Sequence, residues 1–453
     1  MNHRNIIFAT ILLGCLAGNV AAKVVIDADY PGGNIIVQRI DGDKVDLKQD
    51  LRDTKGWWFY WSFQVRGASG RKLTFRFTNK NVIGTRGPAV SVDEGKTWSW
   101  MGTKSVKGSS FTYAFPAAIK DAKPVRFAFA IPYQEANLKQ FLSAYKNSKY
   151  LSIQQLCKTR KGRIVERVHI GRLDGQAPYR ILLTCRHHSC ESIASYVLEG
   201  AMAAMLADTE AGRWFCKNVE VMAIPFVDKD GVEDGDQGKN RKPRDHNRDY
   251  IGKSVHPSIA ALREFVPKWS AGRAKIAIDL HCPWIRGGSN ESIYIVGSKS
   301  KAIWEAQCRF AGILESVCGD ALPYKASSNL PFGKSWNTGA NFKAGKSCSR
   351  WASELKGIDL ATTIEVPYAN ANKITITPKL ARAFGAAIVE AMYKYLHTQR
   401  KDSDSAGKKH ATLELQKRSM LVCDTDRVSL RYSPGRGELA HVQGQRRTLS
   451  IHD

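Results

Sequence analysis

The sequence contains no apolar run long enough to span a bilayer as a helix. The run near the N-terminus covers residues 6–17 and no later one is longer, whereas a membrane-spanning helix needs about 20 apolar residues. Arg4 precedes this run and small residues at 20–22 close it, which is the layout of a signal peptide. Cys15 offers the alternative of a bacterial lipoprotein site. We therefore expect a signal peptide at 1–22 and a secreted or periplasmic protein with no transmembrane segment.

The cysteines have no regular spacing, and no C-x-x-C pair occurs. Ten cysteines are present, and Cys15 lies in the predicted signal peptide, so an odd number remains. An odd number argues against a complete disulfide framework. We expect mostly buried thiols, with one or two bridges at most.

Acidic residues are scarce relative to basic ones. The chain has 42 Asp and Glu against 68 Lys and Arg, a formal net charge of +26. This excess favours attraction to polyanions. The basic residues are scattered rather than gathered in one run, which is typical of a solvated basic surface. No nucleic-acid-binding motif accompanies the charge, so we do not expect a nucleic-acid partner.

Residues 23–132 have the pattern of an all-β domain. Aromatic-rich or alternating runs, separated by turn residues, cover 57–65, 72–79, 111–115 and 125–131. Strands at this spacing predict a small β-sandwich. Residues 91–98 fit the S-x-D-x-G-x-x-W turn of sialidase propellers, but the motif occurs once, where a propeller needs one per blade. We interpret it as a hairpin turn in which the Asp93 side chain caps its own backbone.

Residues 133–398 change to strands that alternate with helices. Apolar strands are predicted at 179–184, 219–226, 275–280, 292–296 and 361–366, and helices after 191, 257 and 302 and at 378–398. This pattern predicts an α/β domain whose mixed sheet is flanked by helices, so the chain is multidomain. Residues 399–453 have neither period and are rich in polar and basic residues. We expect them to form a disordered basic tail.

A histidine and a glutamate lie between the first apolar strand and the helix that follows it. His188 and Glu191 form an H-x-x-E pair there. In a first helical turn, residues i and i+3 share a face, so an imidazole and a carboxylate can converge on one ion. Zinc accepts such donors, and a catalytic site needs a third protein ligand and an open position.

Two further strand ends offer the missing groups. His281 follows the strand at 275–280 and supplies a third ligand, and Glu365 lies at the end of its strand, where it can act as general base. Ligands of α/β sheets gather at the carboxyl ends of strands. The polar stretch 228–250 between these groups lacks the spacing of a calcium loop. It also contains a rival metal pair, His246 and Asp249.

The ordered set of H-x-x-E (188–191), D-G-V (230–232), Arg241, N-R (247–248), His281 and Glu365 resembles the zinc carboxypeptidases of the M14 (carboxypeptidase A) family. The fit is better to the branch that resembles cytosolic carboxypeptidases, which carries a β-sandwich ahead of the catalytic domain. Residues 127–129 and 132–133 resemble the junction of that branch. The resemblance covers roughly residues 23–398. Cys190 and Asp228-Lys229 depart from the usual residues, but neither departure removes a ligand.

The resemblance implies a role for each matching residue. It makes His188, Glu191 and His281 the ligands of one zinc ion per chain, and Glu365 the general base and acid. It implies that Asn247 and Arg248 bind the terminal carboxylate of the substrate, a task that suits a planar guanidinium. It implies that Arg241 polarises the scissile carbonyl and stabilises the oxyanion, with Arg244 as the alternative residue for this role. The tyrosine that is usual in the family's pocket has no clear counterpart in the sequence.

The resemblance therefore implies a zinc metallocarboxypeptidase that hydrolyses the C-terminal residue of peptides or proteins. Lys346 and Arg350 fall in the interval that lines the family's side-chain pocket, so acidic C-termini are a hypothesis and Arg350 is the candidate binding residue. Cell-wall peptides are an alternative substrate. An M14-related deacylase of the aspartoacylase or desuccinylase type is an alternative activity. A binding protein with a dead peptidase domain is less favoured, because dead members normally lose a ligand or the catalytic glutamate.

Overall fold

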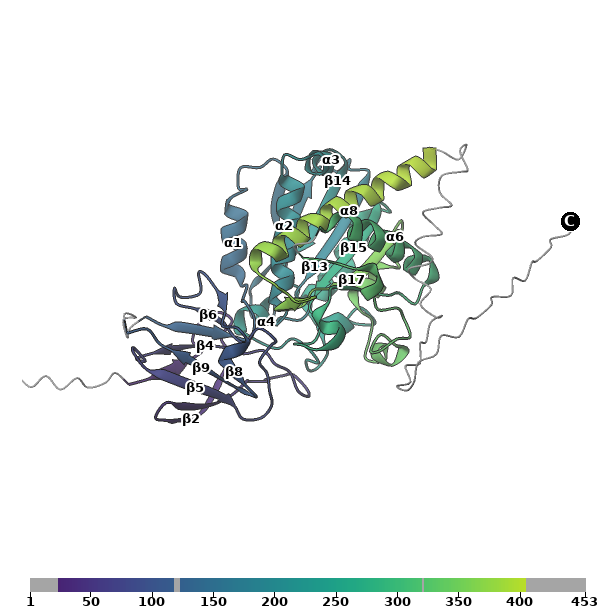
Figure 1. Cartoon of the computed structure of the whole chain (residues 1–453). Coiled ribbons are helices and arrows are strands. Elements are labelled where there is room, and N and C mark those ends of the chain that lie inside the picture. Colours follow the sequence, from purple (N-terminus) through teal and green to yellow (C-terminus); the bar gives the residue numbers. More distant parts are fainter. Residues whose placement is uncertain (1–22, 118–122, 320–321, 405–453) are drawn as a thin grey trace, which may run out of the picture.

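A computed structural model describes residues 23–117, 123–319 and 322–404 of the chain (Figure 1). The predicted signal peptide at 1–22 and the predicted tail from 405 onward lie outside the described residues. The prediction that the tail begins at 399 is wrong, because helix α8 (Pro378–Asp404) continues through 404. No glycine or proline falls between 386 and 404 to end the helix earlier.

Two five-stranded sheets make up the N-terminal region. The first has the order β1-β4-β10-β6-β7, with bounds Val25–Asp27, Ser62–Arg66, Val125–Ala128, Ala89–Ser91 and Ser99–Trp100. The second has the order β2-β3-β5-β9-β8, with bounds Ile36–Asp41, Lys44–Lys48, Lys72–Phe77, Ser110–Ala114 and Val106–Lys107. Alternate residues of β5 are buried, and Phe75 packs against Phe63 of the other sheet with ring centroids 5.3 Å apart. Both sheets therefore contribute to one aromatic core.

The predicted hairpin is confirmed, and one predicted strand is shorter than expected. Strands β6 and β7 pair in antiparallel fashion around residues 91–98, and Asp93 Oδ1 accepts a hydrogen bond from the Thr97 amide at 2.9 Å. Residues 57–61 are not in a strand, although they were predicted to extend β4. Their aromatic side chains pack across the molecule instead: the Trp57 ring lies 4.9 Å from that of Trp284.

A seven-stranded mixed sheet organises the rest of the chain. Its order is β11-β12-β14-β13-β15-β17-β16, with bounds Leu151–Lys158, Ile164–Gly171, Val219–Ile224, Tyr179–Cys185, Ala274–His281, Leu360–Glu365 and Tyr294–Val296. The four strands β14, β13, β15 and β17 are parallel. Strands β12 and β16 run antiparallel to them, and β11 pairs with β12 in antiparallel fashion. This sheet confirms the prediction of an α/β region with mixed strands. A small hairpin, β18 (Asn370–Ala371) with β19 (Ile374–Thr375), follows β17.

Helices cover both faces of this sheet (Figure 1). The α-helices before α8 are α1 (Glu135–Ser143), α2 (Ser192–Leu206), α3 (Glu210–Asn218), α4 (Lys229–Asp234), α5 (Pro257–Ser270), α6 (Lys301–Val317) and α7 (Cys348–Ala352). Short 3-10 turns occupy 103–105, 246–248, 288–291, 326–328 and 339–342. Successive residues of a strand point to opposite faces. Accordingly, Ile181 belongs to the core that contains α2, α6 and α8, whereas Leu182 belongs to a second core with α5 and α7. Among the helices that the structure describes, none is long and apolar enough to cross a membrane.

The parallel strands bring four chain segments to one edge of the sheet. Strands β13, β15 and β17 end at Cys185, His281 and Glu365, and β14 ends shortly before Asp228. His281 and Glu365 are direct partners in the register of β15 and β17. The residues that follow β13 and β14 therefore lie beside His281 and Glu365.

Candidate active site

A buried arginine shapes the loop that follows β13. Arg186 adopts a left-handed backbone conformation, with φ of 60°, and only 1% of the residue is exposed. Its guanidinium donates to the Ser189 carbonyl at 3.0 Å, to the Tyr133 carbonyl at 2.9 Å and to Ser195 Oγ at 3.0 Å. These bonds fix the loop that carries His188. His188 and Glu191 were predicted to lie on the first turn of a helix, and this prediction is wrong. His188 precedes α2, and Glu191 is the N-cap residue of that helix.

His188, Glu191 and His281 meet at one point. His188 Nδ1 lies 2.9 Å from Glu191 Oε1, and His281 Nδ1 lies 2.8 Å from Glu191 Oε2. One ligand atom from each of the three buried residues falls within 4.8 Å of the others, which makes them a candidate metal-binding group. The Glu191 carboxyl is buried, which raises its pKa, but Lys239 and the two histidines outweigh burial and bring the pKa well below its usual range.

Each imidazole is held through its other nitrogen. His188 Nε2 lies 3.2 Å from Asp245 Oδ1, and His281 Nε2 lies 2.7 Å from Asp279 Oδ2. A carboxylate only accepts hydrogen bonds, so both nitrogens of each ring face acceptors; with Nε2 donating to its aspartate, Nδ1 would be the nitrogen that gives its lone pair to a bound metal ion. This is the way in which metal-binding histidines are usually oriented.

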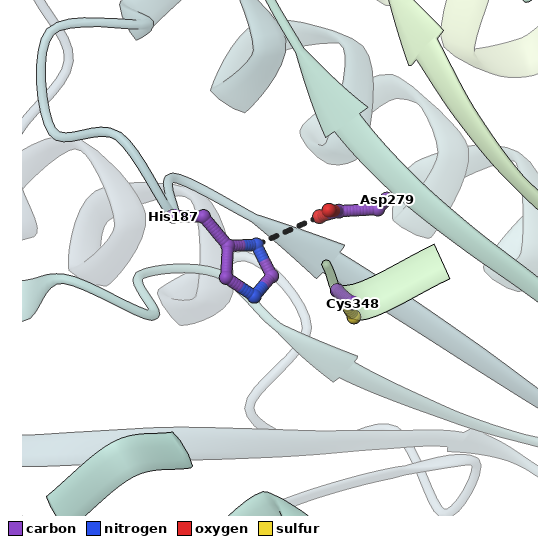
Figure 2. Close-up of side chains that lie close together, drawn as sticks. All are labelled: His187, Asp279 and Cys348. Carbon is purple, nitrogen blue, oxygen red and sulfur yellow. Dashed lines mark ion pairs between the residues drawn. The ribbon is translucent and has the colours of Figure 1, made fainter. Parts of the chain in front are cut away.

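A second buried group, formed by His187, Asp279 and Cys348, lies next to His281. Figure 2 shows His187 pointing at Asp279, with Cys348 beside them on α7. His187 Nδ1 lies 2.8 Å from Asp279 Oδ1, and its Nε2 lies 2.7 Å from the Tyr250 hydroxyl. These three side chains could also hold a metal by proximity. However, both Asp279 oxygens and His187 Nε2 already have hydrogen-bond partners, and His187 Nδ1 faces Asp279 Oδ1. We therefore interpret the group as a support for His281.

Glu365 faces the metal-binding group from the neighbouring strand. Its side chain is 5% exposed, and its Oε2 has no hydrogen-bond partner among the described residues. Burial raises the pKa of the Glu365 carboxyl, and His281 and Lys239 offset only part of this effect. A carboxylate with a free oxygen and a raised pKa is well suited to proton transfer.

A cavity of about 370 Å³ opens above these residues. It is lined by His188, His281 and Glu365, and by the candidate substrate-binding residues Asn247, Arg248 and Arg350. Arg248 donates to Asn341 Oδ1 at 2.9 Å and to the Asn247 carbonyl at 2.7 Å. The Arg350 guanidinium lies 4.3 Å from the centroid of the Phe342 ring. Neither arginine forms a salt bridge within the part of the chain that the structure describes.

Two predicted residues lie elsewhere. Arg241 does not line the cavity: it is buried and bonds to Asp228 at 2.7 Å, to Asp53 at 2.9 Å and to Asp236. Three carboxylates hold its guanidinium outside the cavity lining, so this placement does not support the predicted contact of Arg241 with the scissile carbonyl. Its competitor Arg244 bonds to Asp249 at 2.8 Å and is likewise absent from the lining.

Two other candidate residues or pairs, Lys346 and the pair His246 and Asp249, also lie apart from the site. Lys346 lies outside the cavity lining and pairs with Glu354 at 2.7 Å. The rival metal pair does not form, because Asp249 accepts hydrogen bonds from the amides of Val255 and His256. Polar residues of 228–250 thus mainly bond to one another.

The structure adds cavity residues that the sequence did not indicate. Lys239 lies beside Glu191, at 2.8 Å from Nζ to Oε1. Trp58, Trp284 and Tyr294 also line the cavity, and the rings of Trp58 and Trp284 are 5.0 Å apart. Trp58 comes from the N-terminal region. No spacing rule links it to the motifs, so only the fold could identify it.

The cysteines near the site are buried free thiols. Cys185, Cys190 and Cys282 are buried and unpaired, and burial raises the pKa of Cys185 and of Cys190 to about 12. A neutral thiol is a poor nucleophile and a poor metal ligand. This agrees with the expectation that these residues are structural.

Named proteins share sequence with the chain. It is 24% identical over 352 residues to cytosolic carboxypeptidase 3 of Mus musculus, which covers 68% of this chain and 34% of that protein. It is 23% identical over 288 residues to cytosolic carboxypeptidase 6 of Caenorhabditis elegans, which covers 57% of this chain and 62% of that protein. The chain thus spans about a third of the length of the mouse relative. No protein-family model matches the sequence.

Solved structures of bacterial metallo-carboxypeptidases have the same fold. The protein of Burkholderia cenocepacia superposes with a TM-score of 0.68 at 20% identity, and the match covers 83% of this chain and 99% of that one. The protein of Pseudomonas aeruginosa, in complex with (2-guanidinoethylmercapto)succinic acid, gives a TM-score of 0.65 at 17% identity, with 82% and 99% covered.

These relatives correct the prediction of location. The sequence relatives are named cytosolic carboxypeptidases, which contradicts the prediction of a secreted or periplasmic protein with a lipoprotein site at Cys15. That prediction rested on one apolar stretch, and a general hydropathy pattern is weaker support than an alignment over most of the chain. In contrast, the relatives confirm the predicted branch. Its sequence relatives are cytosolic carboxypeptidases and its structural neighbours are metallo-carboxypeptidases, and both support an M14 carboxypeptidase-like family for this chain.

Proposed function

We propose that the protein is a zinc metallocarboxypeptidase that hydrolyses the C-terminal residue of peptides or proteins. The observation that carries the proposal is the convergence of His188, Glu191 and His281 within 4.8 Å of one another, in a cavity that Glu365 and Arg248 also line. The relatives are named carboxypeptidases, and this supports the reaction type.

The donor set fits zinc. Two imidazole nitrogens and one carboxylate are ligands that catalytic zinc sites use, with a fourth position open for water or substrate. Both Nδ1 atoms lie within 2.9 Å of Glu191 oxygens, so a cation at this point would relieve the crowding of polar atoms. When bound, zinc would supply Lewis acidity toward the scissile carbonyl and the attacking water. His188, Glu191 and His281 would hold one ion per chain.

Glu365 handles the proton. Its unpartnered Oε2 can take a proton from the attacking water. The resulting carboxylic acid then gives that proton to the nitrogen of the leaving amino acid. Burial favours this neutral intermediate form of Glu365, because burial penalises the charged carboxylate.

Asn247 and Arg248 hold the terminal carboxylate of the substrate. The Asn247 side chain is fixed, since its Oδ1 accepts a hydrogen bond from the Cys348 amide at 2.8 Å. The Arg248 guanidinium has neutral partners only, so its charge is available to an anion. A planar guanidinium binds a carboxylate through two parallel hydrogen bonds. This contact selects free C-termini over internal peptide bonds.

Arg350 gives the enzyme a preference for acidic C-terminal residues. Its guanidinium lies against Phe342 in the cavity without a carboxylate partner among the described residues. A Glu or Asp side chain on the substrate would supply that partner. The overall basic charge of +26 also favours acidic substrates.

The test is release of C-terminal amino acids from a peptide panel by the wild type and by Glu365→Gln. Each peptide is paired with its C-terminally amidated form. We expect about one bound zinc per chain, no cleavage of amidated peptides, and a loss of activity of about 100- to 10,000-fold in the variant. Cleavage of N-acyl amino acids but of no peptide would favour the deacylase, and equal cleavage of amidated peptides would exclude a carboxypeptidase.

We further propose that residues 23–132 form a β-sandwich domain and residues 133–398 the catalytic domain. Four aromatic rings from both N-terminal sheets pack together, with every pair of ring centroids within 6.5 Å: Phe63, Phe75, Phe111 and Phe127. A core shared in this way is the defining feature of a sandwich. The proposed boundary follows Pro132, whose carbonyl accepts a hydrogen bond from the Tyr196 hydroxyl.

A further inference from the structure

A buried lysine stands beside the metal-binding group. Lys239 Nζ lies 2.8 Å from Glu191 Oε1, and 16% of its side chain is exposed. Lys239 lines the cavity together with His188, His281 and Glu365. Among the basic residues that line the described cavity, it is the one whose charged atom forms an ion pair with a member of this group. The substrate bond that is cut must come close to this ammonium.

A positive group at this place would accelerate hydrolysis of a peptide bond. Attack on the carbonyl carbon moves negative charge onto the carbonyl oxygen, and fixed cations or N–H donors lower the energy of that state. Arg241 and Arg244 cannot act here, because carboxylates hold both outside the cavity. Arg248 and Arg350 lie in the part of the cavity assigned to the terminal residue.

We propose that Lys239 is the catalytic residue that stabilises the negative charge on the carbonyl oxygen of the scissile bond. This role rests on the proposed carboxypeptidase function. Lysine has three donors on a flexible stem, so its ammonium can turn from Glu191 to a substrate oxygen without a change of the backbone. Glu191 would share its charge with a bound zinc ion, which weakens its hold on Lys239.

The N-terminal region positions this lysine. Lys239 Nζ lies 5.4 Å from the centroid of the Trp58 ring, a distance at which the ring face attracts a cation. Trp58 is in turn packed against Trp284, three residues after His281. The wall formed by Trp58 and Trp284 therefore keeps the ammonium close to the metal-binding group.

The experiment compares Lys239→Met and Lys239→Arg with the wild type on one cleavable peptide. We expect Lys239→Met to lower kcat by about 100- to 1,000-fold, the usual effect of removing one oxyanion donor, with KM changed little. Lys239→Arg should recover part of kcat, because it restores a positive donor. Lys346→Met is the matched control, since Lys346 has a similar exposure of 21% and pairs with Glu354 outside the cavity.

Two further readouts separate catalysis from structure. Zinc content, measured by mass spectrometry, should stay the same in Lys239→Met. The affinity for a tetrahedral phosphonate peptide analogue should fall by a factor similar to the loss in kcat, whereas the affinity for the uncleaved amidated peptide should not. Loss of zinc with activity, or a kcat within about threefold of wild type, would overturn the role of Lys239. A wild type that cleaves no peptide would instead overturn the proposed function, and this role with it.

Discussion

The Arg350 guanidinium lies against an aromatic ring and has no carboxylate partner among the described residues. We expect Arg350→Gln to lower kcat/KM for peptides that end in Glu by about 10- to 100-fold, since a charge-assisted hydrogen bond contributes about 1.5–3 kcal/mol. Peptides that end in Leu should be cut at an unchanged rate. Arg167→Gln is the matched control, because its guanidinium lies 3.9 Å from the Phe265 ring outside the cavity. An equal loss for both peptides would remove Arg350 from side-chain selection.

Asp234 gives the stability of the protein a dependence on pH. Burial raises the pKa of this carboxyl, but Arg163 and Lys161 outweigh burial and lower it below its usual value. The stabilisation is therefore present above the pKa of the unfolded chain, about 3.9, and is lost as the pH falls through the lower folded value. We expect Asp234→Asn to reduce the free energy of unfolding by about 1 kcal/mol at pH 7.

The measurement for Asp234 is urea unfolding of wild type and variant at pH 7 and at successively lower pH. The difference between the two proteins should shrink below about pH 4, the usual range of Asp. Asp208→Asn serves as the control, because Asp208 also pairs with an arginine but its side chain is 91% exposed. A difference that stays constant down to low pH would show that the ion pairs of Asp234 do not stabilise the fold.

Single residues of the site were predictable from sequence where a strand end fixed their place. His188 and Glu191 follow a strand, and His281 and Glu365 are the last residues of theirs. Parallel strands bring these carboxyl ends to one edge of the sheet. The choice among Lys239, Arg241 and Arg244 was not predictable in this way. All three lie in the six-residue segment 239–244. The distant Asp53, with Asp228 and Asp236, draws Arg241 away from the cavity, and Asp249 pairs with Arg244.

At the scale of elements, the close packing of α2 and α8 depends on two glycines. A Cβ at Gly385 would lie 2.0 Å from the Val197 carbonyl oxygen, and one at Gly200 would lie 2.1 Å from that of Arg382. We expect Gly385→Ala to lower the free energy of unfolding by about 1–3 kcal/mol, since the helix backbones must move apart. Gly312→Ala in α6 meets no atom within 4 Å and should raise it by about 0.5–1 kcal/mol. Chemical denaturation of both variants tests this difference in sign.

Elements were predictable where their hydrophobic pattern was simple. The strands β13, β14, β15 and β17 are almost wholly buried, and each contains a short stretch of apolar residues that a sequence shows directly. The outer strand β11 has an irregular burial pattern with three consecutive exposed residues, so neither period marks it. Residues 57–61 are as aromatic as any strand, yet 57–59 pack against Trp284 of the α/β region. Contacts between distant segments determined their conformation, and local pattern carries no information about such contacts.

At the scale of the whole molecule, Arg241 joins the N-terminal region to the α/β region. Its guanidinium bonds to Asp53 on one side and to Asp228 and Asp236 on the other, and only 7% of its side chain is exposed. Removing one partner of a buried charge cluster leaves the remaining charges uncompensated, which costs about 3–5 kcal/mol. We therefore expect Arg241→Met to lower the free energy of unfolding by this amount, as measured by chemical denaturation. Arg263→Met should change it little, because Arg263 donates to neutral oxygens only.

Arg241→Met, compared with Lys239→Met, distinguishes the roles of these two basic residues. Arg241→Met should keep the kcat of the folded protein at low temperature, since no atom of Arg241 lines the cavity. Lys239→Met should show low kcat instead, and its stability is compared in the zinc-loaded protein, where zinc would compensate the charge of Glu191. If Arg241→Met instead loses kcat while remaining fully folded, then the guanidinium reaches the substrate in the working enzyme. In that case the three carboxylates hold it only in the absence of a substrate, and the sequence-based assignment of Arg241 to the scissile carbonyl would be correct after all.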